Sequence, residues 1–392
     1  MPTVVVDNGS GLVTSIVIPL RAWPGTHALT VVATKGIAVS GAAATSASAV
    51  LAAAAVVIVA PAPTPIPANT VNVPSSIDAT GSSDASSALN SFIGSVPDGS
   101  TIVFRAGGTY RLDTGIYVSG RNRLVFEGNG ATLRANGSGA SLLASPFAID
   151  QGNSYITIRD FTITGNNPNT TTLYNAGQEN QFGVGVWGST NVEIANNTIS
   201  HTWGDGVYVS GNDTTHVSSD SVWVHDNTFS YIGRSGIALT AGSHVTVEHN
   251  SFDRVGIHVF NIEPDTAYQI DTFDTFEDNT VGIYSLSTNY VGYFFAADGA
   301  AGSTVHDVTV TGNTVVGNPH GGYGGYAHGL DTSVQVARRA NITFTNNSTS
   351  TAAAGPVLAF DHVDGVTVTG NTQPLSSRSL TEFTDCTGVV YP

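Results

Sequence analysis

Three carboxylates in the middle of the chain have the residue type and spacing for acid–base chemistry on a glycan. Asp205 and Glu263 each border an apolar segment, and Asp265 follows shortly after Glu263. Cleavage of a glycosidic bond uses two carboxyl groups, about 5–5.5 Å apart for retention of configuration or about 6.5–9.5 Å apart for inversion. We therefore predict that Asp205, Glu263 and Asp265 include the acid, base or nucleophile of a hydrolase, with the individual roles left open.

Further side chains in the same stretch are suited to binding a sugar chain. The candidate substrate-binding residues are Trp187, Tyr208, Arg234, His258 and Asn261. Trp187 and Tyr208, together with nearby Trp203, offer flat apolar rings with a polar edge. A plainer interpretation stays open: the carboxylates are solvated surface groups, and Arg234 forms an ordinary ion pair.

A repeated strand pattern must position these residues. The motif V-x-[VI]-x-x-N ends at Asn197, Asn227, Asn250, Asn313, Asn347 and Asn371, with looser copies ending at Asn129 and Asn279. From Asn197 onward the copies follow one another at a nearly regular spacing, closer from Asn227 to Asn250 and wider from Asn279 to Asn313. A repeat of about 20–50 residues is typical of solenoids and β-helices.

Within most copies, apolar residues alternate with other residues, as in Val192-Glu193-Ile194. This two-residue period predicts strands with one face buried. Coils stacked about 4.8 Å apart bury these faces as one continuous column and pair every backbone edge with the next coil. The final Asn of each copy is predicted to be structural, because Asn tolerates left-handed backbone geometry and its amide can bond to neighbouring coils.

With this repeat, the chain resembles the right-handed parallel β-helix proteins of the pectin-lyase-like superfamily, from about Val71 to Tyr391. The strings Trp203-Gly204-Asp205-Gly206 and Ile262-Glu263-Pro264-Asp265 resemble recurrent strings in bacterial β-helix proteins of the carbohydrate-active type. The resemblance implies an all-β, single-stranded right-handed parallel β-helix and a polysaccharide as its partner. Because aliphatic side chains fill the inside of such coils, the chemistry must lie outside.

A short helix is predicted ahead of the stack. Residues 85–96 carry one apolar stripe at helical spacing, formed by Ala88, Leu89, Phe92, Ile93 and Val96. Asp84 is the predicted N-cap. The helix and the turn and strand after it resemble the cap of many polysaccharide-processing β-helices, phage tail depolymerases included, where the cap closes the open end of the apolar column.

Three neighbouring coils align without gaps. Matching residues 206–210, 236–240 and 259–263 stacks Tyr208, Ala238 and Asn261 in one outward column, Ser210, Thr240 and Glu263 in a second, and Asp205, Ser235 and His258 in a third. The polar or Gly-rich runs 211–220, 264–272, 298–304 and 316–330 are predicted as loops on related sides of the stack. Such loops would wall a groove for an extended polymer.

Other enzyme classes differ in the residues they require. Lys35 is the only lysine and precedes the repeat, whereas pectate-lyase-like eliminations typically combine an Arg base with Lys and Ca²⁺. No cofactor is expected for a hydrolase, and Ca²⁺ is the one that a lyase would add. A lyase or epimerase with His201, Tyr208 or His258 as base is the second interpretation. A glycan-binding or adhesive surface module without catalysis is the third.

The composition favours a secreted or cell-surface protein and argues against nucleic acid as a partner. A formal charge of −16 argues against nucleic acid, because a phosphate backbone needs a basic surface. Forty-four Gly and only 11% charged residues suit a secreted or cell-surface solenoid. Cys386 is the only cysteine, so no disulfide framework exists within the chain.

The stretch ahead of the repeat is of a different kind. We predict three parts: a partial immunoglobulin-like remnant at 1–36, an apolar segment with a Pro-rich linker at 37–70, and the β-helix at 71–392. Residues 37–60 carry no charge, which leaves open a membrane or export segment as well as strand material. Contact with a membrane is expected only through this segment.

Overall fold

The computed structural model describes residues 69–316, 325–328, 339–349, 358–372 and 381–391, and four short strands ahead of them. The chain divides into two compact units, Met1–Ile66 and Pro67–Pro392. In the first unit, β1 (Thr3–Asp7) pairs antiparallel with β2 (Val13–Val17), and β3 (Gly25–Thr26) pairs antiparallel with β4 (Val57–Ile58). The rest of the predicted immunoglobulin-like remnant, and nearly all of the apolar segment and linker, lie outside the described residues. No helix in the described residues is long and apolar enough to cross a membrane.

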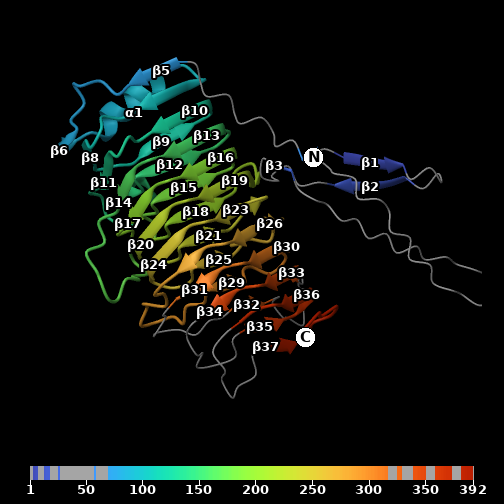
Figure 1. Cartoon of the computed structure of the whole chain (residues 1–392). Helices are drawn as coiled ribbons and strands as arrows, with labels where there is room; N and C mark the ends of the chain where they lie inside the picture. Colours follow the sequence, from blue (N-terminus) through green and yellow to red (C-terminus); the bar gives the residue numbers. More distant parts are fainter. Residues whose placement is uncertain are drawn as a thin grey trace, which may run out of the picture. The chain divides into compact units, whose positions relative to one another are not determined.

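The second unit is a stack of coils whose strands form three parallel sheets (Figure 1). Sheet 1 contains β5 (Asn69–Asn72), β7 (Ser100–Val103), β10 (Asn122–Glu127), β13 (Ser154–Arg159), β16 (Thr190–Ala195), β19 (Ser219–His225), β22 (Gly242–Ser243), β23 (Thr246–Glu248), β26 (Ile270–Thr272), β27 (Thr275–Glu277), β30 (Thr304–Thr311), β33 (Arg339–Thr345) and β36 (Val363–Thr369). Sheet 2 contains β6 (Thr80–Asp84), β8 (Thr109–Leu112), β11 (Thr132–Ala135), β14 (Thr162–Thr164), β17 (Thr198–Ser200), β20 (Thr228–Ile232), β24 (Ser251–Val255), β28 (Thr280–Val281), β31 (Thr314–Val315) and β34 (Ser348–Thr349). Sheet 3 contains β9 (Ile116–Ser119), β12 (Phe147–Asp150), β15 (Val184–Trp187), β18 (Val207–Ser210), β21 (Ile237–Leu239), β25 (Phe260–Ile262), β29 (Phe295–Ala297), β32 (Gly325–His328), β35 (Leu358–Asp361) and β37 (Thr381–Thr384).

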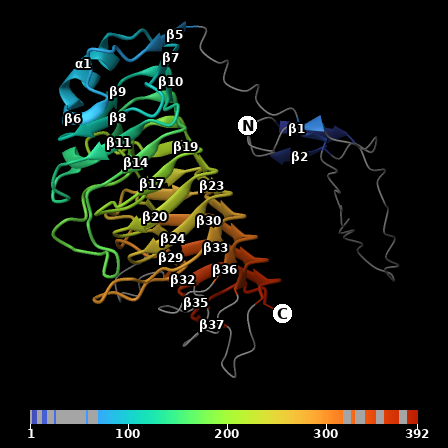
Figure 2. The same cartoon turned by 60° about the vertical axis from the view of Figure 1, so that its left-hand side comes forward.

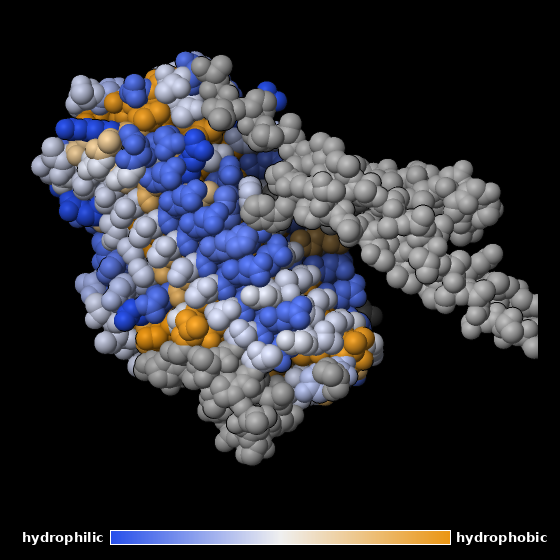
Figure 3. All heavy atoms as spheres, in the orientation of Figure 1, coloured by the Kyte–Doolittle hydropathy of each residue, from blue (hydrophilic) through white to orange (hydrophobic). Residues whose placement is uncertain are grey.

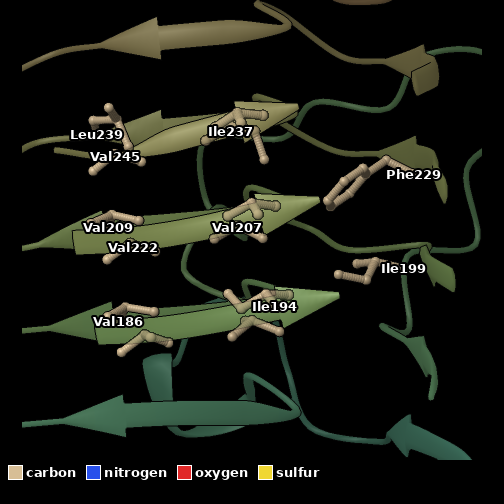
Figure 4. Packing of buried hydrophobic residues seen from close by; sticks show 14 of the residues in the cluster. Val186, Ile194, Ile199, Val207, Val209, Val222, Phe229, Ile237, Leu239 and Val245 are labelled. Carbon is tan, nitrogen blue, oxygen red and sulfur yellow. The ribbon is translucent and has the colours of Figure 1, made fainter. Parts of the chain in front are cut away.

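From β7 to β35 the coils run through the sheets in the order 1, 2, 3, and strands of the same sheet pair in parallel from one coil to the next. The sequence repeat therefore predicted the architecture correctly: the fold is a parallel β-helix. Its inside is one apolar cluster to which all three sheets contribute, as Figure 4 shows for Val222 of sheet 1, Phe229 of sheet 2 and Val207 of sheet 3. Ile194 and Val247 are both 0% exposed, which confirms that they point inward. On the face shown in Figure 3, hydrophilic side chains cover most of the middle of the stack.

A ladder of asparagines follows the corner between sheets 1 and 2. The Nδ2 atom of Asn227 donates to Oδ1 of Asn250 (3.0 Å) and to the carbonyl of Ile194 in the preceding coil (2.8 Å). The same side-chain bond links Asn197, Asn227, Asn250, Asn279, Asn313, Asn347 and Asn371 in turn. The structural role that the repeat predicted for these residues is confirmed.

Two details of that prediction are wrong. The left-handed residue is the one before each ladder Asn, for example Asn196 (φ 55°), Asp226 (φ 55°) and His249 (φ 54°). This corner turns at the preceding residue, which frees the ladder amide to point inward and bond along the stack. Asn129 is not in the ladder, because it is exposed and its amide N–H donates to the Glu127 carboxylate at 3.3 Å within its own turn.

Helix α1 (Ser86–Ser95) lies at the N-terminal end of the stack (Figure 2). Leu89 and Ile93 are buried in the shared core, so the helix closes the apolar column as predicted, although Ala88 is exposed. The predicted N-cap is wrong: Ala85 is the N-cap residue, and Asp84 ends strand β6. Asp84 still binds the helix start, since its Oδ1 accepts from the amide N–H of Ser86 (3.0 Å).

Candidate functional site

The three predicted columns lie on the outer face of sheet 3. Strand register pairs Tyr208 with Ala238 and Ala238 with Asn261. Two residues further on, the backbone N–H of Glu263 donates to the carbonyl of Leu239 at 2.8 Å, which keeps Glu263 in line with Thr240. Aligning the repeats thus placed side chains that are a whole coil apart in sequence next to one another, as expected for stacked coils.

The third column follows from two backbone bonds. The amide N–H of Gly206 donates to the Ser235 carbonyl, and that of Gly236 donates to the His258 carbonyl, both at 2.9 Å. Asp205, Ser235 and His258 therefore occupy equivalent places just before strands β18, β21 and β25. All three predicted columns are confirmed as neighbours in space.

Loops border sheet 3 on two sides. Residues 211–218, 263–269 and 298–303 connect sheet 3 to sheet 1, as the runs predicted from sequence. The fourth predicted loop, at 316–330, follows sheet 2 instead, and the prediction is wrong for residues 325–328, which form β32 of sheet 3. Most of the remaining residues lie outside the described part of the chain. Long connections from sheet 2 to sheet 3, at 165–183 and 282–294, form the opposite border. Within this second border, the Tyr174 and Tyr290 rings pack edge to face with centroids 5.3 Å apart.

Arg234 organises the charges of the face. It lies in the turn between β20 and β21, and each guanidinium nitrogen is near a different carboxylate. Nη1 donates to Asp205 at 3.1 Å, Nη2 donates to Glu263, and Nε lies 3.8 Å from Glu179. The guanidinium thus joins residues from three coils, which makes it the ion pair between coils that was the plainer interpretation.

Asp205 is enclosed by these contacts. Its side chain has 0% exposure, its Oδ1 accepts from the amide N–H of Ser235 (2.7 Å), and its Oδ2 accepts from Arg234. Burial raises the pKa of Asp205 despite the opposing effect of Arg234. With both oxygens bonded and no exposed surface, Asp205 is placed to hold Arg234 and not to touch a substrate.

Glu263 and Asp265 are the open carboxylates of the predicted trio. The Glu263 side chain is 40% exposed, and its Oε2 accepts from Arg234 and from Nδ2 of Asn261 (2.9 Å). Asp265 is exposed at the start of the next loop. Partial burial, followed by the charge of Glu263, raises the pKa of Asp265. The charge of Glu263 thus acts on Asp265, and it also contributes to raising the pKa of Asp205, which Arg234 links to Glu263.

An aromatic cluster covers the neighbouring coils. The Tyr208 ring stacks on the Phe182 ring, with centroids 4.4 Å apart and planes 9° apart. The centroids of the Trp187 and Tyr208 rings are 5.8 Å apart. A side chain at Gly185 would meet the Trp187 indole at 2.2 Å, so the ring lies directly over this glycine. Trp203 is separate from the cluster, since its Nε1 donates to Asn166 (2.7 Å) on the border formed by 165–183.

The histidine and tyrosine of the face are both held neutral. Burial and nearby Arg234 lower the pKa of His258 to about 3, and its Nδ1 accepts from the amide N–H of Tyr293 (3.0 Å). Burial raises the pKa of Tyr208 to about 12, and its hydroxyl bonds with Thr240 (3.1 Å).

Two residues of the site were missed by sequence reasoning. Glu179 contacts Arg234 and accepts a hydrogen bond from the Tyr174 hydroxyl (2.7 Å), while Phe182 completes the aromatic cluster. Both come from the long 165–183 connection. It has no repeat or periodicity, so the sequence offers no signal that folds it against sheet 3.

The described side chains were compared with the requirements of a metal-binding site. Among the residues that the structure describes, no group of three or more His, Cys, Asp or Glu side chains is arranged to hold an ion.

Comparisons with known proteins agree with the architecture. Residues 108–273 match the family model for a right handed beta helix region. The alginate lyase of Paenibacillus sp. str. FPU-7 has a TM-score of 0.55 at 14% identity, covering 82% of this chain and 99% of that one. The Streptococcus pneumoniae surface protein and adhesin PfbA has a TM-score of 0.51 at 12% identity, covering 82% of this chain and 99% of that one. A search of curated proteins found no match.

Proposed function

We propose that this right-handed parallel β-helix protein, whose fold is that of the pectin-lyase-like superfamily, hydrolyses glycosidic bonds of an extracellular polysaccharide on the outer face of sheet 3. Proteins similar to it in fold alone include both an alginate lyase and an adhesin. The fold therefore does not separate cleavage from binding, and the choice depends on the residues of the face.

One observation carries the proposal. Glu263 and Asp265 are two residues apart in the loop that follows β25, close enough for the charge of Glu263 to act on Asp265 and for the charge of Asp265 to act on Tyr208. The environments of the two carboxyl groups differ. Arg234 and Asn261 both donate to Glu263, so this carboxyl group is held in place to act as the base or nucleophile. Burial and the Glu263 charge raise the pKa of Asp265, as suits a general acid. Two carboxyl groups in unlike environments are what glycoside hydrolysis requires.

Asp205 then has a supporting role. Its bond to Arg234 fixes the guanidinium that in turn orients Glu263. We assign it as a positioning residue, in place of the direct catalytic role predicted from sequence. Loss of Asp205 leaves Glu263 chemically intact but less well oriented, so the rate falls by less than on loss of Glu263 itself.

The candidate bases of a lyase are poorly suited to proton abstraction. A pKa of about 3 makes His258 a weak base, and a pKa of about 12 keeps Tyr208 protonated near neutral pH. His201 lies on another part of the coil, stacked on Tyr231 with centroids 4.8 Å apart. These properties favour hydrolysis over elimination.

A product assay on a panel of polysaccharides tests the proposal. New reducing ends indicate hydrolysis, ultraviolet absorbance of an unsaturated uronate indicates a lyase, and retention without products indicates a binding module. Glu263→Gln and Asp265→Asn are expected to lower the hydrolytic rate by orders of magnitude. Glu382→Gln is the matched control, because Glu382 is exposed on β37 in the same sheet, several coils away. Equal rates for all of these variants and the wild type would place the chemistry elsewhere.

A further inference from the structure

The cations available to sheet 3 are few. Between residues 184 and 311 the chain has two arginines, Arg234 and Arg254, and no lysine. Arg254 lies on β24 in sheet 2 and pairs with Asp253. Arg234 is therefore the one cation that these coils bring to the candidate site.

Arg234 is already fully occupied. Its three guanidinium nitrogens contact Asp205, Glu263 and Glu179, so one positive charge faces three carboxylates. The guanidinium is held inside this shell, with its side chain 21% exposed. A carboxylate on an incoming sugar would have to displace one of these partners, leaving a protein carboxylate unpaired. Arg234 is thus unavailable to neutralise an acidic substrate.

The remaining charges on the same face are negative. Asp150 pairs in register with Trp187, one strand from Ser210, and so lies in the column that leads to Glu263. Asp213, in the loop after β18, contributes to raising the pKa of both Asp150 and Asp265, which places it near both groups. Anionic groups therefore extend along the face on both sides of the aromatic cluster.

We propose that the substrate of this site is a glycan without negatively charged groups. This inference rests on the proposed function and narrows it to a substrate class. A uronate or sulfated polymer carries a charge on each of many sugars, so each sugar bound along the coils of residues 184–311 adds repulsion that no unpaired Arg or Lys of this stretch offsets. A neutral or amino-bearing sugar meets the aromatic rings and the carboxylates without that repulsion.

The test uses polymer pairs that differ only in charge. Polygalacturonate and alginate are compared with their carboxyl-reduced forms, beside neutral glucans, galactomannan, xylan and chitosan, by affinity electrophoresis and by release of reducing ends. We expect retention or cleavage only among the polymers without negative charge, with any reduced polymer bound about tenfold or more tightly than its acidic parent. Stronger binding or cleavage of either acidic parent would overturn the inference while leaving the proposed function standing. A panel from which nothing is retained or cut would count against both.

A charge variant separates electrostatics from shape. Asp213→Lys adds a cation to the face and is expected to increase retention of polygalacturonate, most clearly at low salt, where charges are least screened. Glu382→Lys makes the same charge change at the far end of sheet 3 and should leave retention unchanged. If Asp213→Lys gives no gain, charge does not select the substrate and the inference fails.

Discussion

Asn227 and Asn250 belong to successive coils, and the side-chain Nδ2 of Asn227 donates to Oδ1 of Asn250 at 3.0 Å. The backbone N–H of Asn227 donates to the same Oδ1 atom at 2.9 Å. Both residues are buried. One side chain therefore satisfies two buried donors of the preceding coil. This relationship repeats along the stack and gives each ladder position a measurable share of the stability.

Asn250→Ala is expected to lower the free energy of unfolding by about 1–3 kcal/mol or more, because it leaves buried donors without partners. Thermal unfolding followed by circular dichroism measures the effect. Asn122→Ala is the control, since Asn122 is exposed at the start of β10, lies outside the ladder and does not have a left-handed backbone. Equal effects of the two changes would contradict the ladder's role.

Val247→Asp is expected to prevent stable folding. The side chain of Val247 has 0% exposure inside the column, and burying an unpaired charge there costs several kcal/mol. Val217→Asp makes the same change at a site that is 53% exposed and should leave the melting curve nearly unchanged. A normal melt for Val247→Asp would show that the inward assignment is incorrect.

Gly185→Ala is expected to weaken glycan retention without loss of folding. The added methyl group overlaps the Trp187 indole, with closest atoms 2.2 Å apart, and must push the ring off the sheet. Trp187→Ala should reduce retention similarly. Gly177→Ala, whose new methyl group would meet only the Asn175 side chain at 3.4 Å, is the control. A parallel loss of melting temperature would instead identify Trp187 as a packing residue.

Deprotonation of Glu277, on β27 of sheet 1, should lower the stability of the protein as the pH rises from about 4.5 towards about 7. Partial burial and neighbouring Glu248 raise the pKa of Glu277 from 4.5 to about 7. A carboxyl group whose pKa is raised on folding favours the folded state when protonated, so its contribution is present below pH 4.5 and is lost by pH 7. Glu277→Gln should flatten this part of the melting temperature against pH profile, whereas Glu382→Gln should not. An unchanged profile for Glu277→Gln would rule this group out.

Asp274→Asn should stabilise the protein most at alkaline pH. Asp274 has 0% exposure and lies in register with Val245 and Val308, two core residues. Burial and nearby Asp271 raise the pKa of Asp274, so stability is lost as the pH rises through that pKa. Asn keeps an oxygen to accept from the amide N–H of Val245, the bond that Asp274 makes at 2.9 Å. The melting temperatures of wild type and variant at acidic and alkaline pH decide the outcome.

Repetition explains why sequence reasoning reached part of the site. Tyr208, Ala238 and Asn261 lie in consecutive coils of nearly equal design, so aligning the repeats is enough to make them neighbours. Glu263 was placed in an outward column for the same reason. Arg234 was identified as well, but its pairing with Asp205, Glu263 and Glu179 was not. A long flexible side chain can reach several coils, and which carboxylates it meets depends on how the coils stack.

The sequence by itself determined the coil: alternating Val and Ile set which face is buried, and the recurring Asn marked the corner of each coil and its bond to the next. These are local properties that every repeat expresses. Only the tertiary structure decided that Asp205 is enclosed while Glu263 is open, and that Glu179 and Phe182 from the 165–183 connection complete the face. The burial and pKa of a carboxyl group depend on everything packed around it, and an irregular loop has no period from which its path can be predicted.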